Sequence, residues 1–68
     1  MNTWEEDTDR GDWRFYTGTY TAIVWLRPDG WWVKVGFDKT REIVEDKGQF
    51  KSLELAQAHA EQFIKDHS

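Results

Sequence analysis

The fold is decided by residues 20–37, which read YTAIVWLRPDGWWVKVGF. β-Branched and aromatic residues fill both halves of this stretch, as strands prefer, and the segment RPDG at residues 27–30 separates the halves. In such a segment proline fixes φ at the first corner of a turn, aspartate suits the second corner, and glycine can adopt a positive φ. The pattern therefore predicts an antiparallel hairpin that turns at residues 27–30.

Further elements are expected on both sides of this hairpin. Residues 13–16 and 41–45 have the composition of short strands, and residues 46–48 have that of a turn. Over residues 53–66, apolar side chains recur every three or four positions behind Ser52, a good N-cap, which indicates a helix with one apolar stripe. The elements predict the α+β class: a three- to four-stranded antiparallel meander packed on one face by a single C-terminal helix, in the order β-β-β-α.

The small size of the chain limits how its fold can be stabilised. A chain of 68 residues forms one domain and buries only about 60% of the surface that it exposes when unfolded. It has no cysteine, and His59 and His67 lie near one end, so neither a disulfide nor a metal site is expected. Five tryptophans, four phenylalanines and two tyrosines are then the expected source of stability, since each large aromatic side chain can bury about 150–250 Å².

The acidic charge of the chain is concentrated at its N-terminus. Residues 1–12 carry five acidic side chains and one arginine. The net charge of this segment is therefore −4, the same as the net charge of the whole sequence. We therefore expect residues 1–12 to form an acidic, flexible arm, followed by a single α+β domain over residues 13–68. Trp4 lies within this arm. We expect its side chain to fold back onto the domain, in preference to the alternative that it anchors a partner.

The type of turn at the hairpin decides which tryptophans face the core. With a bulge at Gly30, Trp25 lies on the sheet face that the helix covers. Without the bulge, the register shifts by one residue and Trp25 joins Trp32, Arg27 and Lys34 on the opposite face. We favour the bulged register because Gly30 suits a left-handed position. Both registers place Trp32 and Lys34 on the face that the helix does not cover.

The sequence lacks the residue patterns that catalysis needs. A hydrolase requires a nucleophile, a base and a group that orients the base, but Ser52 is explained as a helix cap and His59 as a boundary residue of the helix. We therefore expect no enzyme, no catalytic or metal-binding residues and no cofactor. The N-terminus also lacks the basic start and apolar run of a signal peptide, and no stretch approaches the roughly 18 apolar residues of a membrane span. A cytoplasmic protein that does not bind membranes is expected.

Aromatic surface that the helix cannot cover is the main functional signal. Exposed apolar patches often mark interaction sites, and tryptophan is enriched at binding hot spots. The pattern predicts a small protein-binding module or inhibitor, of the sort that phages and mobile elements carry, which contacts an unidentified protein through the aromatic sheet face and the acidic arm. The candidate contact residues are Trp32, Lys34, Trp25, Arg27, Arg14 and Trp4. A structural homo-oligomer, such as a homodimer that buries the second sheet face, is an alternative.

A nucleic-acid-binding module is the other alternative. Aromatic and basic side chains on one sheet face could form a stacking platform. Residues 20–66, with GWWVKV at 30–35, FKS at 50–52 and an alanine-bearing helix, resemble the arm-type DNA-binding domain of tyrosine recombinases. That resemblance implies a three-stranded sheet that meets DNA and a helix that backs it. The net charge of −4 disfavours this alternative, because phosphate contacts dominate affinity for DNA.

Overall fold

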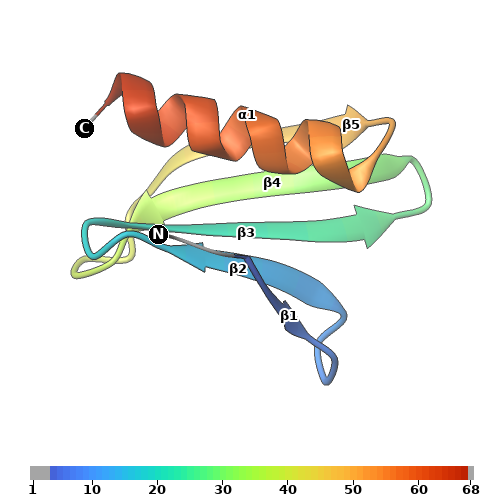
Figure 1. Cartoon of the computed structure of the whole chain (residues 1–68), viewed down its shortest axis with the longest axis horizontal. Helices are drawn as coiled ribbons and strands as arrows, with labels where there is room; N and C mark the ends of the chain where they lie inside the picture. Colours follow the sequence, from blue (N-terminus) through green and yellow to red (C-terminus); the bar gives the residue numbers. More distant parts are fainter. Residues whose placement is uncertain (1–3, 68) are drawn as a thin grey trace.

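The computed structural model describes residues 4–67 and shows a five-stranded sheet with one helix (Figure 1). The elements are β1 (Glu5–Asp7), β2 (Asp12–Tyr16), β3 (Tyr20–Arg27), β4 (Gly30–Phe37), β5 (Ile43–Phe50) and α1 (Leu53–Asp66). The strands lie in the order of the chain, and every neighbouring pair is antiparallel. The predicted α+β class and antiparallel meander with one C-terminal helix are confirmed, but the sheet has five strands instead of three or four.

The additional strand comes from the acidic N-terminal segment. β1 pairs with β2, with Glu6 opposite Trp13. The turn between them is closed by the carboxylate of Asp7, which accepts hydrogen bonds from the backbone N–H groups of Asp9 (3.1 Å) and Arg10 (3.2 Å). Residues 5–12 therefore form an edge hairpin where the sequence predicts a flexible arm, because backbone pairing with β2 compensates for the poor strand propensity of the acidic residues. Residues 1–3 of the expected arm lie outside the described residues.

β5 is longer than the sequence predicts. It continues through residues 46–48, which have the composition of a turn, and pairs with β4 with two shifts in register. Next to Gly48 in this strand, Gln49 adopts a positive φ of 68°. Irregular pairing of this kind bends an edge strand and discourages further strands from adding to it.

β3 and β4 pair directly across a two-residue turn at residues 28–29. Arg27 lies opposite Gly30, and Trp25 lies opposite Trp32. The favoured prediction of a bulge at Gly30 is therefore wrong, and the alternative register without a bulge is the one observed. In this register Ala22 and Val24 of β3, which are fully buried, face the helix, and Trp25 lies on the opposite face.

The core lies between α1 and the sheet face that the helix covers. Ala56 and Ala60 on the helix are fully buried, and so are Val24, Val33 and Val35 on the sheet. Alanine lets the helix approach the sheet closely, and β-branched valines fill the narrow space that remains. The other buried core residues are Phe15, Tyr20, Ala22 and Ile64.

Two side-chain hydrogen bonds join the C-terminal half of α1 to the rest of the core. Trp4 folds back onto the core, where its ring stacks on Phe15 with 4.9 Å between the centroids and its Nε1 donates to a carboxylate oxygen of Glu61 at 2.7 Å. The hydroxyl of Tyr20 donates to the backbone carbonyl of His67 at 3.1 Å. Within residues 4–67, no helix is both long enough and apolar enough to span a membrane.

Candidate functional site: an aromatic and basic sheet face

The side of the sheet opposite α1 gathers most of the candidate residues, and we call it the outer face (Figure 1). Residues that lie directly opposite each other on antiparallel strands point to the same face. The pairs Trp25–Trp32, Arg14–Ile23 and Ile23–Lys34 therefore share one face. The outer face consists of Asp12, Arg14, Tyr16, Thr21, Ile23, Trp25, Arg27, Trp32, Lys34 and Gly36.

Two indoles and two cations form a continuous row on the outer face, the aromatic strip, which consists of Arg27, Trp32, Trp25 and Lys34. The rings of Trp25 and Trp32 lie 6.5 Å apart between centroids, at an interplanar angle of 27°. The guanidinium carbon of Arg27 lies 5.7 Å from the Trp32 ring, and Nζ of Lys34 lies 5.9 Å from the Trp25 ring. Such cation–π contacts contribute about 0.5–1 kcal/mol each at exposed sites, so the row is partly ordered before any partner binds.

Trp32 is held in one orientation by the turn and by β5. A Cβ atom added at Gly48 would overlap the six-membered ring of Trp32, so the indole packs directly on the backbone of that residue. Its Nε1 donates to Asp29 Oδ1 at 2.9 Å, and Asp29 Oδ2 accepts from Nε2 of Gln49 at 3.2 Å. These two hydrogen bonds hold the pKa of Asp29 below its ordinary value. The hairpin turn thus fixes the position of an aromatic surface residue, and such preorganisation lowers the entropy cost of binding.

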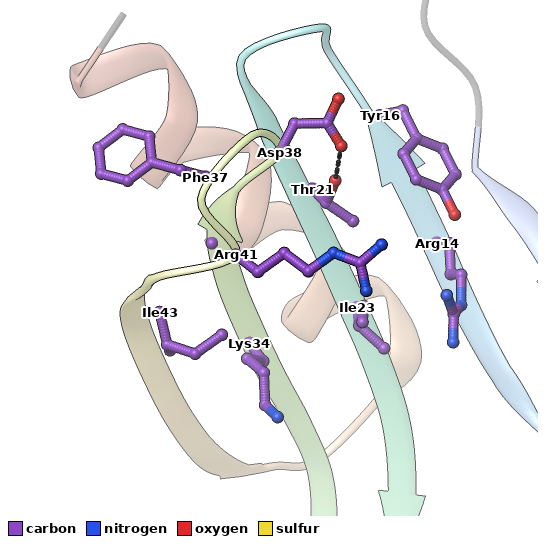
Figure 2. A pocket seen from close by; sticks show the side chains of 10 residues that line it. Arg14, Tyr16, Thr21, Ile23, Lys34, Phe37, Asp38, Arg41 and Ile43 are labelled. Carbon is purple, nitrogen blue, oxygen red and sulfur yellow. Dashed lines mark hydrogen bonds between the residues drawn. The ribbon is translucent and has the colours of Figure 1, made fainter.

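A groove of about 310 Å³ occupies the other end of the outer face (Figure 2). Three of the side chains that line it are cationic, namely Arg14, Lys34 and Arg41, and one is a carboxylate, Asp38. Its remaining lining residues are Tyr16, Thr21, Ile23, Gly36, Phe37 and Ile43. The groove is therefore a mainly basic site with apolar side chains between the charges.

Two acidic side chains, Asp12 beside Arg14 and Asp38 in the lining of the groove, already accept hydrogen bonds. Asp12 Oδ1 accepts from Nε of Arg14 at 3.3 Å, and Asp38 Oδ1 accepts from the hydroxyl of Thr21 at 2.9 Å. The hydrogen bond to the carboxylate of Asp12 raises the pKa of Arg14 further above its ordinary value. Among residues 4–67, neither Lys34 nor Arg41 has a carboxylate within ion-pair distance. These two cations are available to an incoming anion.

Arg41 reaches the groove from the connection between β4 and β5. It adopts a positive φ of 62°, and its backbone N–H donates to the carbonyl of Phe37 at 2.8 Å. Figure 2 shows its side chain extended across the groove, above Ile23 and towards the wall that carries Arg14 and Tyr16. The tight turn therefore aims the guanidinium over the sheet.

The structure brings together five of the six residues predicted to contact a partner. Trp25, Trp32, Arg27, Lys34 and Arg14 lie on the outer face. The sixth, Trp4, packs on the opposite side of the sheet, against the core. The sequence reasoning missed Arg41 and Tyr16, which line the groove. Because Arg14 and Tyr16 alternate along β2, the sequence could have placed Tyr16 on the same sheet face as Arg14. No local sequence pattern indicates where the side chain of Arg41 points.

The described part of the chain offers no cluster of metal ligands. Within residues 4–67, no three or more His, Asp or Glu side chains are placed to hold a metal ion. The contact between Nε2 of His59 and a carboxylate oxygen of Glu45, at 2.8 Å, joins α1 to β5 on the helix side of the sheet. This pair has a structural explanation and lies away from the outer face.

Three features of the outer face bear on function: the paired indoles, their flanking cations and the groove. They form one continuous surface, because Lys34 contacts the ring of Trp25 and also lines the groove. No protein-family model, no curated protein and no solved structure matches this chain.

Proposed function

We propose that this protein is a small protein-binding module or inhibitor, and that the aromatic strip is its contact surface. The observation that supports this most strongly is the pairing of Trp25 and Trp32 on a sheet face that no other described element covers. Tryptophan and arginine are the residues most enriched at binding hot spots, and the strip combines both types. Its half-buried rings are anchored at their inner surfaces and keep part of their area accessible.

The size of the outer face suits a protein partner. The molecule measures 30 × 24 × 24 Å, so one face is comparable to the roughly 800 Å² that each partner buries in a standard interface. The two indoles lie two positions from the turn on β3 and β4, with Arg27 on one side and Lys34 on the other. Aromatic residues with polar and charged residues around them are the usual arrangement of such interfaces.

The charges around the strip also favour a protein partner over nucleic acid. Lys34 lies opposite Asp46 on β5, and Arg14 lies opposite Glu5 on β1. A phosphate backbone that passed over Lys34 and Arg14 would therefore also pass acidic residues of the neighbouring strands. A protein can place neutral or cationic groups next to those carboxylates, and this mixed pattern then contributes to specificity.

Affinity capture from cell lysate with chemical cross-linking tests the proposal. The full chain would be compared with Trp25→Ala and with the control Leu55→Ala, which removes an apolar side chain that is 53% exposed on α1, on the other side of the molecule. We expect wild type and Leu55→Ala to retain the same partner and Trp25→Ala to retain at least about tenfold less, since a hot-spot residue contributes roughly 2 kcal/mol or more. Equal retention by a folded Trp25→Ala would rule out the strip as the contact surface.

A nucleic-acid-binding function is the second candidate, favoured by one observation. Aromatic rings flanked by Arg27 and Lys34 have the arrangement of a platform on which bases stack. Fluorescence titration with a thymidine oligonucleotide tests it, because such binding weakens steeply as salt rises. Glu5→Gln combined with Glu6→Gln should strengthen binding without removing β1, whereas deletion of residues 1–12 would also remove the edge of the sheet. Absence of binding at low salt would eliminate this candidate.

Self-association through the outer face is the third arrangement. Two copies that pack their aromatic strips together would form a symmetric dimer. Sedimentation at several concentrations distinguishes this arrangement from the first two. A monomer at all concentrations would exclude it, and a dimer that is lost in Trp25→Ala would replace the proposal of a different protein partner.

A further inference from the structure

We infer that the groove of the outer face binds a carboxylate, presented by an acidic side chain of the same partner segment that lies on the aromatic strip. This inference rests on the proposed function for the source of the carboxylate. It concerns the groove, in which Arg41, Arg14 and Tyr16 lie outside the strip and Lys34 is shared with it.

The charged side chains of the groove differ in whether they already have a partner. Arg14 is already paired with Asp12, and Asp38 already accepts a hydrogen bond from Thr21. Lys34 and Arg41 have no such carboxylate among residues 4–67. The two cations therefore present unused donors to the same space, and that space accepts an anion.

The backbone of Arg41 adopts a left-handed conformation, which favours the site as a functional one. A positive φ at a residue other than glycine, asparagine or aspartate is unfavourable, and such positions often occur at functional sites. The hydrogen bond from its N–H to the carbonyl of Phe37 closes the turn and directs the side chain over the sheet (Figure 2). A glycine would fit this backbone without strain, so the guanidinium is the feature that distinguishes arginine here.

The apolar floor and the size of the groove also suit a small anionic group. Ile23 and the buried Gly36 form an apolar floor beneath the charges, and a less polar environment strengthens ion pairing. A volume of about 310 Å³ is at the lower end of the roughly 300–1,000 Å³ of small-molecule sites. This space suits an aspartate or glutamate side chain better than a nucleotide.

The acidic residue in the lining favours a carboxylate over a phosphate. The planar fork of an arginine matches either group through two parallel hydrogen bonds. Asp38 at the edge of the groove repels a doubly charged phosphate more strongly than a singly charged carboxylate. This difference in repulsion favours the side chain of an acidic residue.

The distance between groove and strip defines the partner segment. Trp25 and Ile23 are two positions apart on β3, which corresponds to about 7 Å along an extended strand. An extended partner segment that places an aromatic residue over Trp25 therefore places its next residue but one above Ile23. The partner motif is an aromatic residue, any residue, and then aspartate or glutamate.

Two matched peptides test this inference by NMR titration of the ¹⁵N-labelled full chain. The probes are the terminally blocked tripeptides Trp-Ser-Glu and Trp-Ser-Gln, at equal ionic strength. We expect the glutamate peptide to bind about 5- to 10-fold more tightly and to shift the Nε signal of Arg41, which the glutamine peptide leaves in place. Arg41→Gln and Lys34→Gln should each reduce the preference to within about twofold, whereas Arg10→Gln, at a side chain that is 69% exposed in the β1–β2 turn, should preserve it.

The outcomes separate the groove from the strip. Equal binding of both peptides on Trp25 and Trp32 would overturn the carboxylate site and leave the proposed contact surface standing. If neither peptide bound but sodium acetate shifted the signals of Arg41 and Lys34, the anion site would stand and the strip would fail. If inorganic phosphate displaced acetate at equal concentration and ionic strength, the carboxylate assignment would be overturned.

Discussion

The two faces of this sheet are built from the same hairpin but pack their side chains differently. Towards α1, β3 and β4 present Val24, Val33 and Val35, which are fully buried, and Trp31 packs against this core. Towards the outer face, the same strands present Trp25 and Trp32, which are only half-buried. Two of the three tryptophans of the hairpin thus lie where no described element covers them, so packing beneath the helix does not account for their position.

The contrast also shows how a small chain divides two tasks between its faces. The helix face is closed by close packing, with Trp4 and Phe15 stacked at its edge. The outer face is ordered by directional contacts instead: a hydrogen bond from Trp32, packing on Gly48 and nearby cations. If this division is correct, substitutions on the helix face should mainly lower stability, and those on the outer face should mainly lower binding.

The largest effect is expected for Phe15→Ala on the helix face. Phe15 is buried and stacks on Trp4, and truncation of a buried phenylalanine lowers the free energy of unfolding by about 3–5 kcal/mol. Urea denaturation followed by circular dichroism measures the change. The neighbouring Tyr16→Ala on the outer face, 47% exposed, is the matched control and should cost less than about 1 kcal/mol. Similar losses for both variants would contradict the division between the faces.

Prediction from sequence succeeded where the deciding interactions are local. The β3–β4 hairpin and the helix from Leu53 to Asp66 follow from turn residues, a cap and an apolar stripe, all within short stretches of chain. The side chain of Ser52 accepts a hydrogen bond from the N–H of Leu55 at 3.2 Å, as an N-cap does. β1 was missed because pairing with a neighbouring strand, and not its own propensity, makes it a strand.

The register and the groove depend on contacts distant in the sequence. The register of the hairpin follows from the narrow space under Ala56 and Ala60, and Trp32 packs on Gly48 from another strand. Sequence reasoning could identify Trp25, Trp32, Arg27, Lys34 and Arg14 as candidates from residue type and alternation. It could not place Arg41, because a positive φ and the direction of a side chain depend on the closed turn.

For Gly48→Ala we expect an intermediate loss in the free energy of unfolding. The new methyl group would overlap the ring of Trp32, so the indole must leave its position on β5. Overpacking of this kind costs about 1–3 kcal/mol, measured by urea denaturation. Tryptophan fluorescence should change at the same time, because the environment of Trp32 changes. The double variant Gly48→Ala with Trp32→Ala should lose less stability than the sum of the two single variants; strict additivity would show that the two residues do not contact.

A smaller effect of opposite sign is expected for Arg41→Gly. Glycine adopts a positive φ without a steric penalty, whereas the left-handed conformation costs other residues about 1–2 kcal/mol. The greater freedom of glycine in the unfolded chain offsets part of this gain, so we expect stability between unchanged and about 1 kcal/mol higher. Thermal denaturation measures it. A loss of stability above about 1 kcal/mol would show that the arginine side chain supports the fold of the groove.

The smallest expected effect is a change in the position of the Trp32 indole at acidic pH. Hydrogen bonds from Trp32 and Gln49 hold the pKa of Asp29 in the folded protein below the ordinary aspartate value of 3.8. A carboxylate with a lowered pKa stabilises the fold above its unfolded pKa, and this contribution is lost as the pH falls through the folded pKa. The Nε1–H signal of Trp32 should therefore stay in place from neutral pH to about pH 4 and shift only below it. In Asp29→Asn the amide oxygen can still accept from Trp32 but does not titrate, so the shift should disappear. An Asp29 carboxyl that titrates at or above 3.8 by NMR would show that the turn does not hold the indole through this carboxylate.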